Sequence, residues 1–188
     1  MDFKLFKLNL KIAWMKAMGK MNKVSSSLEF TSAKINAPKI LIIFPIDKEV
    51  IPKSMEAISG IINSQKDKDA QFSFIMNNNI ENRMNFYNIE TLSLVVLKSG
   101  KIDNLNDVID KIYFKKFDIV IDLNINFKIE IAKMINELDS KYKIGFVSKY
   151  SDYFYNIQLK AKDNNIYEPI KDIIGWDEQY RNIWGRFL

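Results

Sequence analysis

The sequence predicts an α/β protein. We expect a single Rossmann-like three-layer sandwich with a mostly parallel sheet of five or six strands, preceded by an amphipathic N-terminal helix. Short apolar runs alternate with stretches of helical periodicity, which is typical of βαβ units with right-handed crossovers. The first run, KILIIF at 39–44, is apolar on both faces, as buried parallel strands are. The length of 188 residues suits one such domain with an additional arm.

Residues 1–24 are predicted to form a basic amphipathic helix, with its regular part at 3–21. Three lysines recur on one helical face, and aromatic and aliphatic side chains cover most of the remaining surface. Such a helix can lie in a membrane interface or on a partner protein, and the alternative is that it packs on its own domain. The candidates for membrane or partner contact are Phe3, Lys4, Phe6, Lys7, Lys11 and Trp14. Residues 25–38, polar and closed by a proline, are predicted to be a linker.

The domain at 39–188 holds six apolar runs that predict strands and three segments whose apolar spacing predicts helices. The strands are KILIIF (39–44), FSFIM (72–76), TLSLVVL (91–97), FDIVIDL (117–123), YKIGFVS (142–148) and FYNIQL (154–159). The helices carry apolar side chains from Ile51 to Ile62, from Leu105 to Tyr113 and from Phe127 to Leu138. Residues 166–188 are predicted to form one or two short amphipathic helices.

The composition excludes several kinds of chemistry. The chain has no cysteine and no histidine, which removes thiolate catalysis, the commonest general base and the commonest transition-metal ligands. The six glycines lie far apart and form neither GxGxxG nor a Walker loop, so we expect no dinucleotide cofactor. The net charge of +5 comes almost entirely from lysine, whereas base recognition favours arginine. We therefore expect no metal, no cofactor and no nucleic acid.

Two features bear on localisation. No apolar run approaches the roughly 20 residues of a spanning helix. Lysines interrupt the first 21 residues, which leaves no uncharged core for a signal peptide. We expect a cytoplasmic protein, held at the inner face of the cytoplasmic membrane if the N-terminal helix binds lipid.

Candidate catalytic residues follow two of the predicted strands. Ligands of open α/β sheets bind at the carboxyl ends of the strands. Asp47 and Glu49 follow the first strand, and Asp122 lies near the end of FDIVIDL. Burial can raise the pKa of a carboxyl towards that of a useful general base. The alternatives are that Asp47 and Glu49 cap or solvate a helix start, and that Asp122 bonds to neighbouring loop backbone.

Candidate ligand-binding residues lie in the loops after two strands. They are Asn124, Asn126, Ser148, Lys149 and Tyr150. The last two open the basic and aromatic segment KYSDYFYN, which could stack on a sugar or a base. The alternative is packing at a sheet edge, with the lysine and phenol tips exposed.

Three segments in this order, KILIIF, FDIVIDLN and YKIGFVSKYSDYFYN, resemble the N-terminal domain of glycosyltransferase family 9. These are heptosyltransferase-like enzymes of the GT-B type, and the resemblance covers about residues 39–159. In that family a Gly-Asp turn after the first strand carries the acid taken as the catalytic base. Here the turn is PIDKE, without glycine, and Asp47 or Glu49 falls nearest to that position.

The resemblance also implies a role. GT-B enzymes transfer sugars in a cleft between this domain and a second Rossmann domain that holds the nucleotide-sugar donor, and this sequence ends about where that domain would begin. We therefore expect a glycosyltransferase-like module, not catalytic on its own. It would bind a glycan acceptor at the cytoplasmic membrane surface in envelope glycan or lipopolysaccharide synthesis. The alternatives are a small α/β interaction protein unrelated to sugars, and one half of a split glycosyltransferase.

Overall fold

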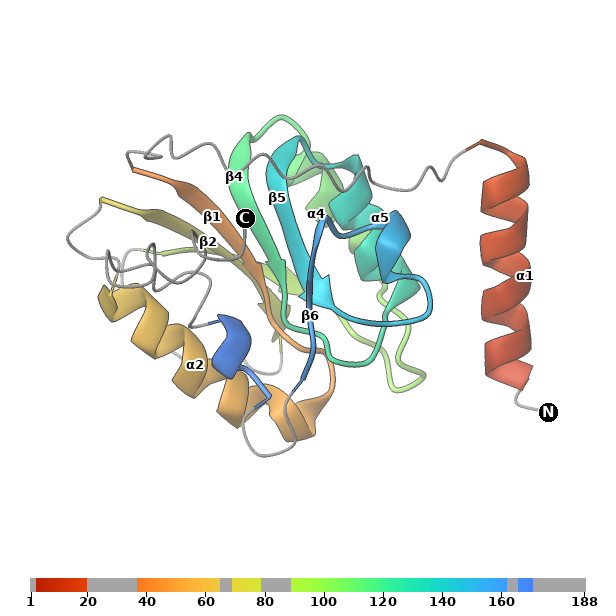
Figure 1. The fold of residues 1–188 in the computed structure, drawn as a ribbon, viewed down its shortest axis with the longest axis horizontal. Coiled ribbons are helices and arrows are strands. Elements are labelled where there is room, and N and C mark those ends of the chain that lie inside the picture. Colours follow the sequence, from red (N-terminus) through yellow and green to blue (C-terminus); the bar gives the residue numbers. More distant parts are fainter. Residues whose placement is uncertain (1–2, 20–36, 65–68, 79–88, 162–165, 171–188) are drawn as a thin grey trace, which may run out of the picture.

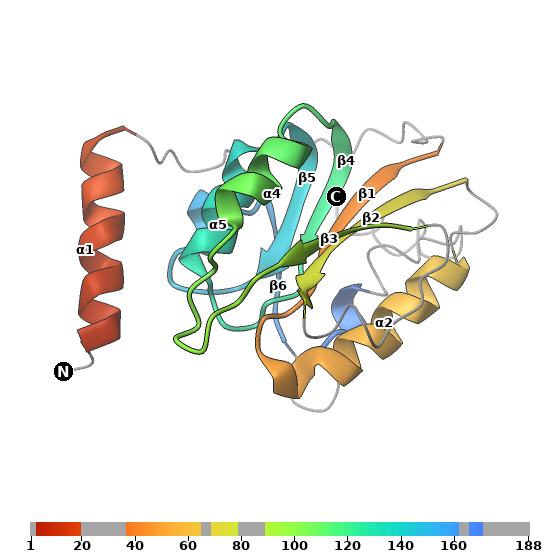
Figure 2. The same cartoon turned by 180° about the vertical axis from the view of Figure 1, so that it is seen from behind.

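The structure, a computed structural model, describes residues 3–19, 37–64, 69–78, 89–161 and 166–170. Within them, six strands form one sheet in the order β3-β2-β1-β4-β5-β6, and every neighbouring pair is parallel (Figures 1 and 2). The strands are β1 (Lys39–Ile43), β2 (Gln71–Asn77), β3 (Glu90–Leu94), β4 (Phe117–Asp122), β5 (Ser140–Phe146) and β6 (Ile157–Leu159). The predicted α/β fold class is confirmed.

Helices cover both faces of the sheet. The α-helices are α1 (Phe3–Ala17), α2 (Ile51–Ser64), α4 (Leu105–Ile112) and α5 (Ile129–Glu137), and the short 3-10 helices are η1 (Lys48–Val50) and η3 (Ser151–Tyr153). Helices α4 and α5 lie on one face, and α2 lies on the other together with the helical turn at 168–170 (Figures 1 and 2). This is the expected three-layer arrangement.

The alternation of side chains along β1 explains why its sequence is apolar throughout. Ile40 and Ile42 belong to the core cluster on the α2 side, whereas Leu41 and Ile43 belong to the cluster on the α4 and α5 side. All four are at most 1% exposed. Each fully buried aliphatic side chain contributes about 1.5–3 kcal/mol relative to exposure, so a central strand with two covered faces favours an unbroken apolar run.

Several element boundaries differ from the predictions. Helix α1 ends at Ala17, and β3 ends at Leu94. The last predicted strand, 154–159, is reduced to β6, because the backbone N–H groups of Phe154 and Tyr155 both donate to the carbonyl of Ser151 and close a turn. The predicted linker at 25–38 lies outside the described residues except for its last two, and so do residues 171–188 of the predicted C-terminal helices.

Helix α1 packs against the domain beside α5 and η3. Ile12 and Met15 are 2% and 4% exposed and join the core cluster of the α4 and α5 side. Lys11 forms an ion pair with Glu130 of α5 across 3.4 Å. The sequence left open whether this helix packs on its own domain, and one of its faces does.

Candidate functional site

The topology places a switch point between β1 and β4. From β1 the chain moves outward to β2 and β3, whereas from β4 it moves outward in the other direction to β5 and β6. Ile43 at the end of β1 pairs with Asp122 at the end of β4. The loops after these two strands therefore leave the sheet side by side. This is the position at which open α/β sheets bind their ligands.

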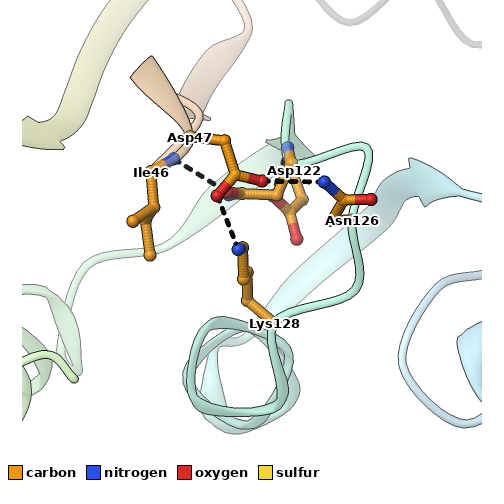
Figure 3. Close-up of polar contacts among 6 residues, drawn as sticks. Ile46, Asp47, Asp122, Asn126 and Lys128 are labelled. Carbon is orange, nitrogen blue, oxygen red and sulfur yellow. Dashed lines mark hydrogen bonds and ion pairs between the residues drawn. The ribbon is translucent and has the colours of Figure 1, made fainter. Parts of the chain in front are cut away.

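Asp47 joins the loop after β1 to the loop after β4 (Figure 3). Its Oδ1 accepts a hydrogen bond from Lys128 Nζ at 2.7 Å, and its Oδ2 accepts one from Asn126 Nδ2 at 2.9 Å. Asp47 precedes η1, but its side chain caps none of the N–H groups of η1. The side chains of Asp47 and Lys128 are 35% and 28% exposed, so this ion pair lies at the surface of the switch point.

The pKa of Asp47 is set by opposing effects. Burial acts to raise it, but the hydrogen bonds from Lys128 and Asn126, together with the charge of Lys128, outweigh burial and hold the pKa below its ordinary 3.8. A lowered pKa makes a carboxylate a weaker base. In this geometry Asp47 is an ion-pair partner and hydrogen-bond acceptor, and it would have to lose Lys128 to become an effective proton acceptor.

Replacement of Lys128 tests this assignment. In Lys128→Met the burial effect is no longer opposed by the cation, so we expect the pKa of Asp47 to rise, measured by NMR titration of its carboxyl carbon. Asn126→Ala removes a neutral donor, and we expect it to raise the pKa less. An unchanged pKa in Lys128→Met would contradict the assignment.

The same ion pair has a small and pH-dependent effect on stability. Because the folded-state pKa of Asp47 is depressed, this stabilisation is present above about pH 4 and is lost as the pH falls through the folded-state value. For an ion pair this exposed, we expect Lys128→Met to change the free energy of unfolding by less than about 1 kcal/mol at neutral pH.

Asp122 lies beneath this surface pair and is 2% exposed. Its Oδ1 accepts hydrogen bonds from the backbone N–H of Asn124 at 2.9 Å and from Asn124 Nδ2 at 2.7 Å. Its Oδ2 accepts the hydroxyl of Tyr155 at 2.6 Å. Asn124 Oδ1 in turn accepts the backbone N–H of Ile46 at 2.9 Å. The bond to neighbouring loop backbone that the sequence allowed is thus present, within a wider network.

Burial dominates the protonation of this network. It raises the pKa of Asp122 above 3.8, against the hydrogen bonds from Tyr155 and Asn124 and the charge of Lys128. Burial also raises the pKa of the Tyr155 hydroxyl well above 10, and the neighbouring Asp122 carboxylate adds to this. Tyr155 therefore remains a hydrogen-bond donor at neutral pH. Asp122 bonds directly to the segments after β4 and β5 through Asn124 and Tyr155, and Asn124 links this network to the segment after β1 through Ile46.

The remaining predicted residues lie at or near the same edge. Glu49 is exposed in η1. Ser148 belongs to the turn after β5, where its N–H donates to Ser151 Oγ and its Oγ accepts the N–H of Tyr150. Lys149 Nζ and the Tyr150 hydroxyl both donate to Asn9 of α1, so helix α1 lies against this ligand-binding candidate segment.

Sequence reasoning did not select Lys128 or assign a role to Tyr155. A signal for Lys128 was present, because a lysine at the start of a helix faces the positive end of the helix dipole and needs a nearby acid. Tyr155 was noted only as part of an aromatic cluster. Its contact with Asp122 joins residues 33 positions apart and depends on the order of the strands.

The described part of the chain contains no group of three acidic side chains close enough together to hold a metal ion. Among these same residues, no helix combines the length and apolar character needed to cross a bilayer.

The parallel sheet, its covering helices and the switch point between β1 and β4 define a Rossmann-like α/β domain. The fold is similar to the crystal structure of a glycosyl transferase family 9 protein from Veillonella parvula DSM 2008, with a TM-score of 0.57 and 14% sequence identity. The match covers 76% of this chain and 42% of that protein, so this chain spans less than half of its length. No family model matches the sequence, and a search of curated proteins finds no match. The likeness is one of fold.

Proposed function

We propose that the protein is a glycosyltransferase-like binding module that takes a sugar or glycan ligand at the β1–β4 switch point. The observation that carries this proposal is the arrangement of Asp47, Asn126 and Lys128. A carboxylate, an amide and an ammonium group meet at the surface of the switch point, and together they offer both acceptors and donors to hydroxyl groups. The fold is similar to that of the family 9 glycosyl transferase from Veillonella parvula, which supports the proposal.

The domain is proposed to bind without transferring a sugar on its own. The lowered pKa of Asp47 supports this, because the carboxylate nearest to the family's base position is engaged by Lys128. Asp122 and Asn124 are buried in bonds to each other and to neighbouring loops. The resemblance to GT-B enzymes, whose chemistry needs a second domain, gives the same expectation.

The proposed location is the cytoplasmic membrane surface, in the synthesis of envelope glycans such as lipopolysaccharide. The basic amphipathic character of α1 supports a membrane location. The proposed kind of glycan is based on the resemblance of the sequence to heptosyltransferase-like enzymes. A lipid-borne glycan acceptor would be presented at that surface.

Ligand binding is tested by NMR titration of the full chain with hexose and heptose phosphates and their nucleotide conjugates. We expect saturable shifts of the backbone amides in residues 45–49 and 124–128, and their loss in Asp47→Ala/Asn126→Ala. Asp118→Ala is the matched control, since Asp118 bonds the backbone N–H of Lys39 at the opposite edge of the sheet. The absence of saturable shifts would contradict the sugar ligand, and sugar transfer that depends on Asp47 would contradict the non-catalytic assignment.

A small interaction protein unrelated to sugars is the second candidate. The observation that favours it is the use of Asp122, Asn124 and Tyr155 in bonds to one another, which leaves these buried polar groups engaged within the chain. This candidate predicts no response to any sugar in the same titration.

A further inference from the structure

Helix α1 has a second apolar face that the domain does not cover. Phe6, Leu10, Trp14 and Met18 are 46%, 61%, 55% and 55% exposed, and we call them the outer face. They are spaced four residues apart, so they form a row along one side of the helix over about 18 Å. The N–H of Met18 still bonds the carbonyl of Trp14, which continues the row past Ala17.

The inner face of α1 consists of Leu8, Ile12 and Met15, which pack on the core cluster of the α4 and α5 side. Polar contacts fasten the helix at three further places. Lys11 pairs with Glu130, Asn9 accepts the Tyr150 hydroxyl, and Lys16 lies over the Tyr153 ring at 4.2 Å from its centroid. The outer face is thus exposed while the helix is held to the domain along its length.

The charge pattern indicates what covers the outer face. Between Phe3 and Ala17 the helix carries four lysines and no aspartate or glutamate. At 100° per residue, Lys7 lies between Trp14 and Met18 around the helix axis, and Lys11 lies just beyond Met18. A second copy of α1 would bring lysines against lysines, because neither helix has an acid between Phe3 and Ala17, and Lys11 pairs with Glu130 of α5. An anionic lipid surface offers the opposite charge to the lysines and an apolar interior to the aromatic and aliphatic side chains.

We infer that α1 is a two-sided helix whose outer face enters an anionic bilayer while its inner face stays packed on the domain. This inference rests on the membrane location proposed above, and it adds that docking leaves the structure unchanged. One consequence concerns the ligand site. Because Lys149 and Tyr150 contact Asn9 of α1, docking places this ligand-binding candidate segment next to the lipid headgroups.

The first test uses vesicle flotation with the full chain. We expect binding to vesicles that contain phosphatidylglycerol, no binding to pure phosphatidylcholine, and weaker binding at high salt. Leu10→Glu should lower the partition coefficient about tenfold or more, because an apolar side chain leaves the bilayer and an acid replaces it. Phe114→Glu is the matched control, since Phe114 is 89% exposed but lies after α4 and outside the outer face. Equal losses in both variants would overturn the role of the outer face.

The second test asks whether α1 leaves the domain. The chain has no cysteine, so Lys11→Cys/Glu130→Cys can be joined by a short thiol-reactive cross-linker across the observed ion pair. The control is the same variant with each of its two thiols blocked by a separate reagent molecule, so that the two cysteines are not joined. We expect the cross-linked and capped proteins to float equally with anionic vesicles. If only the capped protein floats, the helix must detach and this inference is wrong while the membrane location stands. If neither the capped protein nor the unmodified chain floats, the proposed membrane location is wrong as well.

Discussion

Asp122→Ala is expected to destabilise the protein by about 3 kcal/mol, measured by urea denaturation at neutral pH. The substitution removes three hydrogen bonds at once. It leaves the hydroxyl of Tyr155, and the backbone N–H and the Nδ2 group of Asn124, without their acceptor. Both residues are 4% exposed, so water reaches them poorly. A buried polar group that loses its partner costs about 1–3 kcal/mol, which is why the loss should exceed that of an ordinary surface hydrogen bond.

Asp122→Asn separates the loss of hydrogen bonds from the loss of charge. Its Oδ1 can still accept both bonds from Asn124, and its Nδ2 can donate to the oxygen of Tyr155. Because burial raises the folded-state pKa of Asp122 above 3.8, the wild-type protein loses stability as the pH rises through that folded-state value. Asp122→Asn lacks this loss, so its stability relative to wild type should improve from acid to neutral pH. An Asn variant as unstable as the Ala variant at neutral pH would contradict this account.

Gly145→Ala is expected to have the second large effect. A methyl group at this position of β5 would lie 2.7 Å from three ring atoms of Tyr155, which is closer than packed carbon atoms allow. The ring cannot move away freely, because its hydroxyl is bonded to Asp122 at 2.6 Å. We expect a loss of about 1–3 kcal/mol in the free energy of unfolding.

Gly60→Ala is the matched control for the glycine substitution. Gly60 is exposed in the interior of α2, where alanine is the better helix former, so we expect a gain of about 0.5–1 kcal/mol. Tyr155→Leu removes the ring, and a double-mutant cycle with Gly145→Ala should then show a coupling energy of about 1 kcal/mol or more. Additive effects would mean that the ring and the glycine do not constrain each other.

Much of the sheet could be predicted because burial on two faces requires an unusual sequence. KILIIF and FDIVIDL are apolar over nearly their full length, and both became central strands. Residues 154–159 carry a similar pattern but form only a short edge strand. There the backbone N–H groups form a turn with Ser151 in place of hydrogen bonds to the neighbouring strand, and the spacing of apolar residues does not predict this turn.

The candidate site was predictable in position but not in its bonds. Parallel strands place their carboxyl ends at one edge, so Asp47 and Asp122 could be assigned to the same region from sequence. Which atoms meet there depends on the order of the strands. The pairings of Asp47 with Lys128 and of Asp122 with Tyr155 cross 81 and 33 positions of sequence, and no local pattern encodes them.

Helix α1 shows the same division between sequence and tertiary structure. Its composition and spacing determined by themselves that the helix is basic and apolar around most of its circumference. Only packing on α5 and η3 decided that Ile12 and Met15 face inward and that Leu10 and Trp14 face outward. An apolar arc wider than one contact surface is compatible with several orientations. The choice among them is made by the shape of the surface against which the helix packs.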